Sequence, residues 1–199
     1  MVERTSPLGS VFMPGSYGDL SRGAGVRLYE ATPPSIMEAA AWPEKKEALI
    51  AAIANVTGLS LPPGPNAGAA SAEASVFSIG PGRYLVTGGK VLAQRLFEAV
   101  TLDIGTATDL SHGRIAIRIA GPRAEWVLSK LFAIDFSPAA FPAGEGRATA
   151  HHEVFAQIQR TGSDQFDIFV FRSFARSFWI MLCEAAEEVG YEPVGRQDA

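Results

Sequence analysis

Hydrophobic and polar positions along the chain predict two successive series of strands and helices. In the first series, VRLYEAT (26–32) alternates with the two-residue period of a strand, and residues 44–56 place apolar side chains at helical spacing. The turn residues Pro81 and Gly82 separate two short apolar runs, which predicts a hairpin. The predicted elements are strand 26–32, helix 44–56, strands 76–80 and 83–88, helix 90–100 with Val91, Leu92, Leu96 and Phe97 on its apolar side, and strand 102–110.

The second series repeats this order. RIAIRIA (114–120) places isoleucines on one face of a strand, and Pro122 marks the start of the helix that follows it. The predicted elements are strand 114–121, helix 121–132, a proline-rich loop over 136–146, strands 148–160 and 166–171, and a long final helix over 174–189.

The recurring β-α-β-β-α order is that of a ferredoxin-like split βαβ unit. We therefore predict an α+β fold of two ferredoxin-like repeats packed together. A doubly wound α/β fold is the alternative, but tight turns at 80–82 and 161–165 favour hairpins over parallel crossovers. The predicted organisation is an extended N-terminal arm (1–24), a first half (25–112), a second half (113–192) and a C-terminal tail (193–199).

Composition narrows the classes of function. The chain has 199 residues, one cysteine and a net charge of −4, so it needs no disulfide to fold and has no basic footprint for nucleic acid. Neither a signal peptide nor a membrane span is predicted, and we expect a cytoplasmic protein. Only 19% of the residues are charged and 12 are phenylalanine, which suggests that part of the surface is covered.

Several motifs in the C-terminal half resemble a known family. They are the run Asp109-Leu110-Ser111-His112-Gly113-Arg114, the helix start Gly121-Pro122, the loop with Ser137, Phe141-Pro142 and Gly144, and Arg172-Ser173-Phe174-Ala175 before the final helix. In this order and spacing they resemble the gamma subunits of heterotetrameric sarcosine oxidases. The N-terminal half matches that family only loosely.

The resemblance implies a fold similar to the folate-binding module of the glycine-cleavage aminomethyltransferase. Enzymes of this family demethylate sarcosine to glycine and reduce oxygen to peroxide. The resemblance implies alpha, beta and delta subunits as partners, with FAD, FMN, NAD and tetrahydrofolate shared by alpha and beta and a zinc ion on delta. It implies no cofactor on the gamma chain, which is regarded as a packing subunit.

The residues themselves indicate no catalytic, cofactor-binding or metal site. The sequence has no Gly-x-Gly-x-x-Gly motif after a strand and no P-loop. His151 and His152 are neighbours on a predicted strand, so we expect their side chains to point to opposite faces and not to share an ion. Cys183 lies on the core side of the final helix with no histidine near it in sequence.

Arginines make the second half locally basic. Arg114 and Arg118 share one face of a predicted strand, and Arg172 and Arg176 share a helical face if the final helix begins by residue 172. Such arginines pair with acids of their own sheet or of a neighbouring subunit, or they bind a carboxylate ligand such as folate.

Aromatic residues occupy both faces of the strand FDIFVF. Phe166, Ile168 and Val170 lie on one face, and Phe169 and Phe171 lie on the other beside Asp167. The second face is covered either by the other half of the chain or by a partner subunit. The candidate partner-contact residues are His112, Arg114, Arg118, Phe169, Phe171, Arg172, Phe174 and Arg176.

Three hypotheses follow. The first is a gamma-type accessory subunit of a sarcosine oxidase complex, which acts in assembly and self-associates weakly when isolated. The second is a stand-alone folate-binding or one-carbon transfer protein of the same fold. The third is a homodimeric domain that uses its apolar face on itself.

Overall fold

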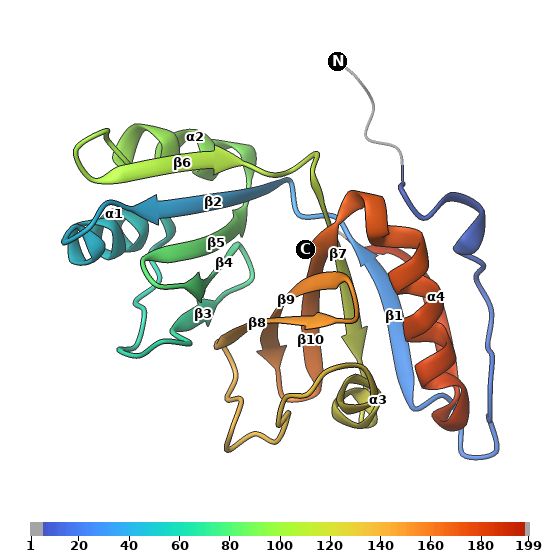
Figure 1. The fold of residues 1–199 in the computed structure, drawn as a ribbon. Coiled ribbons are helices and arrows are strands. Elements are labelled where there is room, and N and C mark those ends of the chain that lie inside the picture. Colours follow the sequence, from blue (N-terminus) through green and yellow to red (C-terminus); the bar gives the residue numbers. More distant parts are fainter. Residues whose placement is uncertain (1–5, 198–199) are drawn as a thin grey trace.

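Two β-sheets, each covered by two helices, make up the computed structural model, which describes residues 6–197 (Figure 1). The five-stranded sheet packs against α1 and α2, and the six-stranded sheet packs against α3 and α4. The α+β fold class is therefore confirmed.

The five-stranded sheet has the order β3-β4-β5-β2-β6, with every neighbouring pair antiparallel. This order is consistent with a ferredoxin-like repeat, since β2, β4, β5 and β6 take the places of the split βαβ unit. Its elements are β2 (Ser35–Ala41), α1 (Lys46–Thr57), β3 (Gly68–Ala70), β4 (Ala74–Gly80), β5 (Arg83–Gly88), α2 (Lys90–Ala99) and β6 (Gly105–Asp109).

The six-stranded sheet has the order β11-β1-β7-β10-β9-β8. Strand β1 is parallel to β11 and antiparallel to β7, and it separates these two strands. Its elements are β1 (Val26–Ala31), β7 (Arg114–Ala120), α3 (Ala124–Leu131), β8 (Gly146–His151), β9 (Val154–Gly162), β10 (Gln165–Phe171), α4 (Ala175–Ala186) and β11 (Tyr191–Gln197), with 3-10 turns at Gly9–Val11, Arg172–Phe174 and Glu187–Val189.

Strand pairing differs from the sequence prediction at both ends of the chain. The strand predicted at 26–32 joins the sheet of the second half, because β1 pairs with β7 and β11. The predicted tail begins inside a strand, since β11 runs over Tyr191–Gln197. The sequence analysis also missed β2. The division into halves at residue 112 stays a prediction.

Two further local predictions were wrong. The single strand predicted over 148–160 is a hairpin of β8 and β9, because the chain turns at His152, whose φ is +50°. On α2, Val91 is 74% and Phe97 47% exposed, and only Leu96 is buried. Helix α2 meets the sheet with a narrower face than its apolar residues predict.

The sheets contact each other through their faces opposite the helices. A small apolar cluster fills this contact, and it includes Phe77 of β4 and Phe169 of β10, with ring centroids 5.7 Å apart. Beside it, the Gln159 amide donates hydrogen bonds to the carbonyl oxygens of Ala69 and Val76 in the five-stranded sheet, at 3.2 and 3.3 Å. The remaining members are Ala31, Ile36, Ile79, Leu85 and Ala116.

The described part of the predicted N-terminal arm lies on its own chain. The segment from residue 6 to residue 24 follows α4 along its length (Figure 1). Leu8 is fully buried, and Phe12 packs on Trp179 with ring centroids 5.3 Å apart. Tyr17 stacks on Tyr191 at 5.4 Å, and the two residues exchange backbone hydrogen bonds. Residues 1–5 of the predicted arm and 198–199 of the predicted tail lie outside the described residues.

Within residues 6–197, no helix combines the length and the hydropathy needed to cross a membrane.

Candidate functional site

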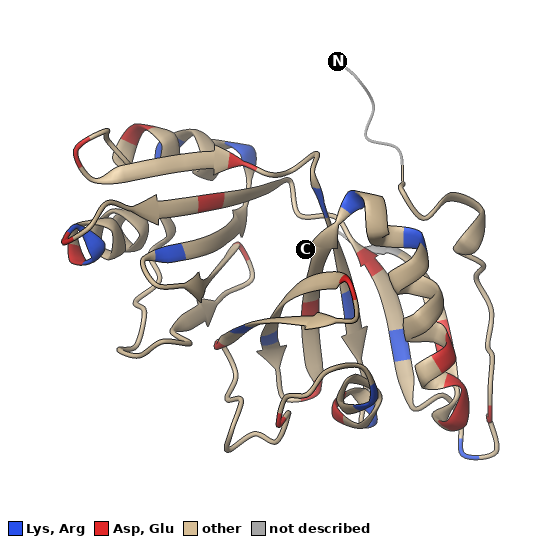
Figure 2. Ribbon diagram, viewed as in Figure 1, with Lys and Arg blue, Asp and Glu red and all other residues tan. Residues whose placement is uncertain are grey.

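Six of the eight candidate contact residues lie at one end of the six-stranded sheet. Arg114 opens β7 and pairs with Phe171, the last residue of β10. The Arg172 backbone N–H donates to the Gly113 carbonyl oxygen at 2.9 Å, which brings the 172–174 turn beside the β6–β7 connection. Figure 2 shows basic residues at the start of β7 and the start of α4. We call this set the arginine edge: His112, Arg114, Phe171, Arg172, Phe174 and Arg176.

Arg114 is the most unusual member of the arginine edge. Only 7% of the residue is exposed, and its Nη1 is buried without a hydrogen-bond partner. The guanidinium carbon lies 3.9 Å from the centroid of the Phe171 ring, and Phe171 is 43% exposed. Burial lowers the pKa of Arg114, with a smaller raising effect from Glu38 and a lowering effect from Arg83.

The carboxylate that acts electrostatically on Arg114 is that of Glu38, and it is hydrogen-bonded to another arginine. Glu38 Oε1 accepts hydrogen bonds from Arg83 Nε at 2.9 Å and from Arg83 Nη2 at 2.7 Å. Both bonds end on the same oxygen, and they hold it beside Arg83 of β5. Arg114 therefore has a nearby negative charge that is bound to another arginine.

Arg118 and Phe169 do not belong to the exposed part of the site. Arg118 makes a bidentate pair with Asp167, at 2.7 Å from Nε to Oδ1 and 2.9 Å from Nη2 to Oδ2. This hydrogen bonding raises the pKa of Arg118 against the opposing effect of desolvation. Phe169 is 1% exposed within the contact between the sheets. For these two residues, the contact within the chain explains the sequence pattern.

A cavity of about 430 Å³ lies beside the Arg118–Asp167 pair. Its wall includes Thr87 of β5, Thr161 of β9 and Gln165 of β10, together with the 70–75 segment. Because Asp167 already neutralises Arg118, the cavity presents hydrogen-bonding groups rather than an unpaired cation.

The shared helical face predicted for Arg172 and Arg176 does not form. Residues 172–174 make a 3-10 turn, and α4 begins at Ala175, so the spacing of four residues does not lie within one α-helix. The Arg176 guanidinium donates from Nε to the Pro7 carbonyl oxygen at 3.1 Å. Arg176 thus helps to hold the N-terminal segment against α4.

His112 is exposed in a turn whose neighbours are structural. The Ser111 hydroxyl accepts a hydrogen bond from the Ile36 N–H at 2.9 Å, and the Ser111 N–H donates to Asp109 Oδ1 at 2.8 Å. These bonds fix the crossing from β6 to β7, where the chain passes from one sheet to the other. The Asp109-to-Arg114 motif is therefore a joint between the sheets that presents His112 at its surface.

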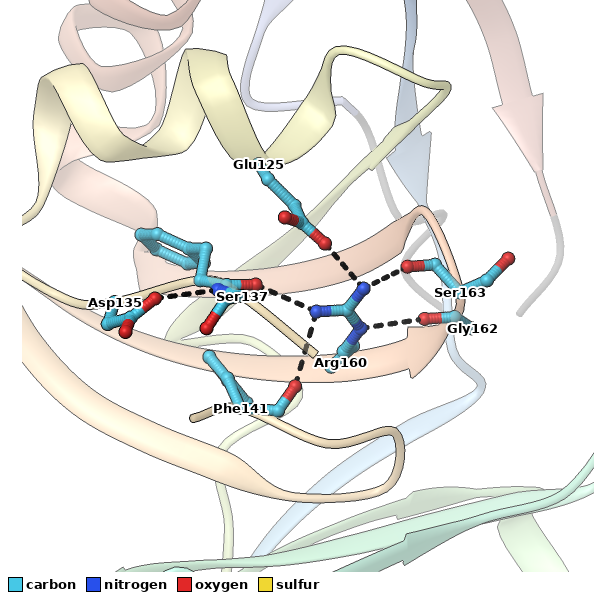
Figure 3. Close-up of polar contacts among 8 residues, drawn as sticks. Glu125, Asp135, Ser137, Phe141, Arg160, Gly162 and Ser163 are labelled. Carbon is cyan, nitrogen blue, oxygen red and sulfur yellow. Dashed lines mark hydrogen bonds and ion pairs between the residues drawn. The ribbon is translucent and has the colours of Figure 1, made fainter. Parts of the chain in front are cut away.

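Sequence analysis missed Arg160, a buried side chain with five hydrogen bonds (Figure 3). It is 2% exposed, and all of its nitrogens donate hydrogen bonds. The acceptors are Gly162 O at 3.2 Å, Phe136 O at 2.8 Å, Phe141 O at 3.2 Å, Glu125 Oε1 at 2.6 Å and Ser163 O. A signal was present, since Arg160 follows Ile158 by two positions and so points to the apolar face of β9.

The two adjacent histidines do not point apart as predicted. His152 takes a left-handed conformation in the β8–β9 turn, and the rings of His151 and His152 have centroids 4.4 Å apart. His151 Nδ1 contacts the Leu131 carbonyl oxygen at 2.5 Å. Among residues 6–197, no group of three or more His, Cys, Asp or Glu side chains is placed to hold a metal ion.

Cys183 of α4 is expected to be a slow nucleophile. Burial raises the pKa of its thiol from 9.0 to about 11, and burial likewise raises the pKa of Tyr191 to about 12. In the folded chain, we expect alkylation by iodoacetamide at pH 9 to be several-fold slower than in urea, because the thiolate is the reactive form.

The same shift has a consequence for stability. The unfolded chain loses the Cys183 proton at a lower pH than the folded chain does, so stability falls as the pH rises from about 9 to about 11. Urea titrations across this range test the expectation, with Cys183→Ala as the control that removes the thiol contribution. A fall in stability of the same size in Cys183→Ala would contradict this expectation, and equal alkylation rates in the folded and unfolded chain would contradict the raised pKa of the thiol.

Comparison with known proteins assigns the chain to a family. The GCVT N-terminal domain family matches residues 65–198, from the segment before β3 to the end of β11. A curated relative, sarcosine oxidase subunit gamma of Corynebacterium sp. (strain P-1), is 31% identical over 147 residues, covering 72% of each chain. The chain belongs to the sarcosine oxidase gamma subunit family. The resemblance drawn from the motifs between Asp109 and Ala175 is thereby confirmed.

Solved structures agree with the gamma subunit family. A chain of the heterotetrameric sarcosine oxidase from Corynebacterium sp. U-96 superimposes with a TM-score of 0.79 at 26% identity, covering 94% of this chain and 96% of that one. The glycine cleavage system aminomethyltransferase T from Bartonella henselae gives a TM-score of 0.59 at 14% identity, covering 86% of this chain and 48% of that one. The second likeness shows the fold alone.

Proposed function

We propose that this chain is an accessory subunit that acts in the assembly of a sarcosine oxidase complex rather than in its chemistry. The observation that carries the proposal is the similarity, over nearly the whole chain, to a subunit of a heterotetrameric sarcosine oxidase. In such a complex, the oxidative demethylation of sarcosine to glycine takes place on other subunits.

The proposed partners are the alpha, beta and delta subunits. By the same proposal, FAD, FMN, NAD and tetrahydrofolate belong to alpha and beta, and this chain contributes a surface to them. The mixed surface of the arginine edge supports this role, because buried cores of protein interfaces are enriched in arginine and aromatic residues.

The proposed contact surface is the arginine edge. His112, Phe171 and Arg176 are exposed there, and Arg172 and Phe174 are half-buried. Arg118 and Phe169 are left out of the proposed surface, since their side chains are engaged within the chain. The five exposed or half-buried residues come from two stretches of the chain that the fold brings together, the turn at His112 and residues 171–176.

Co-purification tests the proposed function. The tagged chain is expressed in its native cell and pulled down, and the eluate is analysed by mass spectrometry and by its flavin absorption spectrum. We expect two large flavin-containing chains and one small chain to elute with it. A colourless homomer would contradict the accessory role, and quenching of the tryptophan fluorescence by tetrahydrofolate in that homomer would favour a stand-alone folate-binding protein.

A further inference from the structure

A second cavity, of about 550 Å³, lies beside the hairpin turn between β4 and β5 in the five-stranded sheet. Its wall is formed by the first turn of α1, the segment before β3, the hairpin turn itself and one residue of β8. The Ala41 N–H donates to the Gly82 carbonyl oxygen at 2.8 Å, and the Ser78 N–H donates to the Ala67 carbonyl oxygen at 2.7 Å. These bonds hold the hairpin turn beside the end of β2 and the segment before β3 beside β4.

Tyr84 of β5 brings an unused hydroxyl group to this cavity. The residue lines the cavity and is 1% exposed, and its hydroxyl makes no hydrogen bond among residues 6–197. A polar group buried without a partner is costly to the fold. Burial raises the pKa of the Tyr84 phenol, and the charge of Glu47 adds to this effect. The hydroxyl therefore stays protonated at neutral pH and can donate a hydrogen bond.

The Tyr84 hydroxyl is accessible from the cavity. Within the described chain, the fully enclosed side-chain atoms without a partner are Arg114 Nη1, Gln157 Oε1 and Gln159 Oε1. Tyr84 Oη is not one of them, so it keeps a small accessible surface, and the cavity is the opening that this residue lines. The electrostatic effect of Glu47 places the hydroxyl near the first turn of α1.

Two further polar side chains of the wall are without a partner in the part of the chain that the structure describes. Lys46 is the first residue of α1, and its ammonium group is held there by no ion pair or hydrogen bond. The backbone carbonyl oxygen of Asn66 accepts from the Gly146 N–H at 3.2 Å, which leaves the Asn66 side-chain amide unbound. No side chain caps the first turn of α1, whose N–H groups favour negative charge.

The charges of the wall favour a ligand with one negative charge. Lys46 is the one cationic residue that lines the cavity, and none of the lining residues is an aspartate or a glutamate. Glu47 follows Lys46 in the chain but does not line the cavity. Because Tyr84 and Asn66 add neutral donors only, the set matches a carboxylate better than a phosphate dianion.

The rest of the wall is largely apolar. Pro65, Ile79 and Pro81 line it, and Gly80 leaves space beside them, since a Cβ there would meet no atom within 4 Å. Sites for organic ligands combine such apolar walls with a few polar groups that fix the orientation of the ligand, in volumes of roughly 300 to 1,000 Å³. The cavity therefore has room for an apolar body attached to the charged group.

We infer that this cavity binds a small organic acid, whose carboxylate accepts hydrogen bonds from Tyr84 and Lys46 and whose apolar body lies against Pro65 and Pro81. The inference goes beyond the accessory role and does not depend on it, because every residue that it uses belongs to this chain. It also gives a reason for a tyrosine at position 84, where phenylalanine would fill the same space without an unpaired hydroxyl.

Calorimetric titration of the full chain tests the inference with benzoate and hexanoate, which carry a carboxylate on a flat and on a flexible apolar body. We expect saturable binding of at least one of them, with a Kd of about 1 mM or lower. Benzamide and hexanamide keep the shapes without the charge and are expected to bind at least about 10-fold more weakly. Acetate, which lacks the apolar body, is expected to bind more weakly by a similar factor of about 10.

Substitutions then locate the site. Tyr84→Phe is expected to weaken binding at least about 10-fold, since it removes a hydrogen bond to a charged group. The same variant is expected to unfold at a temperature no lower than that of the wild type, because the lost hydroxyl has no partner within the described residues. This combination separates a role in binding from a role in the fold.

The neighbouring lysines supply a matched pair of variants. Lys46→Gln is expected to weaken binding about 3-fold, which is the effect of one exposed charge. Lys45→Gln is the control, because Lys45 does not line the cavity and acts electrostatically on Asp103 instead. Binding to this control is expected to stay within about 2-fold of the wild type.

Three results would overturn the inference. They are no saturable binding of either acid at about 10 mM, equal affinity for an acid and its amide, and tighter binding of inorganic phosphate than of both acids. Undiminished binding to Tyr84→Phe would place the acid elsewhere on the chain and would overturn the site. None of these results bears on the proposed function, which co-purification tests separately.

Discussion

Replacing Arg160 with methionine is expected to lower the free energy of unfolding by about 4 kcal/mol, the largest single effect among the predicted variants. The change removes the donors that satisfy the carbonyl oxygens of Phe136 and Phe141, both reached by Nη1 in a buried setting. It also leaves Glu125 without its ion-pair partner. The loop over 136–146, held by these bonds, is expected to loosen before the rest of the sheet.

Chemical denaturation with urea measures this loss. Arg160→Lys is expected to recover only part of the stability, because lysine lacks the planar fork that reaches acceptors on several sides. Arg27→Met is the control at an exposed arginine and is expected to change stability by no more than about 0.5 kcal/mol. If Arg160→Met were as stable as this control, the bonds of Arg160 would not hold the loop.

Adding one methyl group at Gly68 is expected to cost about 2 to 3 kcal/mol. A Cβ at this position would lie 2.1 Å from the Gly144 carbonyl oxygen and 2.9 Å from Phe77 Cβ. The first of these atoms is backbone of the 136–146 loop, so no side-chain rotation relieves the overlap. Because Gly68 lies in β3 of the five-stranded sheet, Gly68→Ala forces the two sheets apart where they meet.

Gly80→Ala is the matched control for this change. It makes the same addition at the end of β4, where a Cβ would meet no atom within 4 Å. We expect its unfolding free energy to stay within about 0.5 kcal/mol of the wild type. Similar unfolding free energies for Gly68→Ala and Gly80→Ala would show that the overlap with the Gly144 carbonyl oxygen is relieved without loss of stability. Amide hydrogen exchange of β3 and β8 would locate any local opening between the sheets.

Local patterns predicted most of the helices and the central strands, because their periodicity is a property of short segments. The final helix lies within its predicted range, and the strand FDIFVF follows its predicted faces, with Phe166 and Ile168 in the helix-side core as expected. The prediction put strand β1 in the wrong sheet. The alternation of its residues indicates a strand, but it does not indicate which strand it pairs with. Pairing between residues 26–31 and 191–197 is a long-range property.

The candidate site was predicted in part for the same reason. Arg114 and Arg118 occupy equivalent positions on one face of β7, and the sequence treats them alike. What separates them is the residue opposite on β10, since Asp167 pairs with Arg118 and Phe171 pairs with Arg114. The register between two strands decides which arginine is neutralised, and single-strand periodicity contains no register.

The pairing of β1 with β11 joins the first strand of the chain to its last. The five-stranded sheet is formed by one continuous stretch, residues 35–109. During synthesis, all of the strands of this sheet are therefore present before the second half of the chain is made. The six-stranded sheet cannot be completed until β11 has been synthesised, and until then one edge of β1 has no strand beside it. A protein with this strand order completes the surface of its six-stranded sheet only after β11 has joined β1, although the two strands are about 160 residues apart in the sequence.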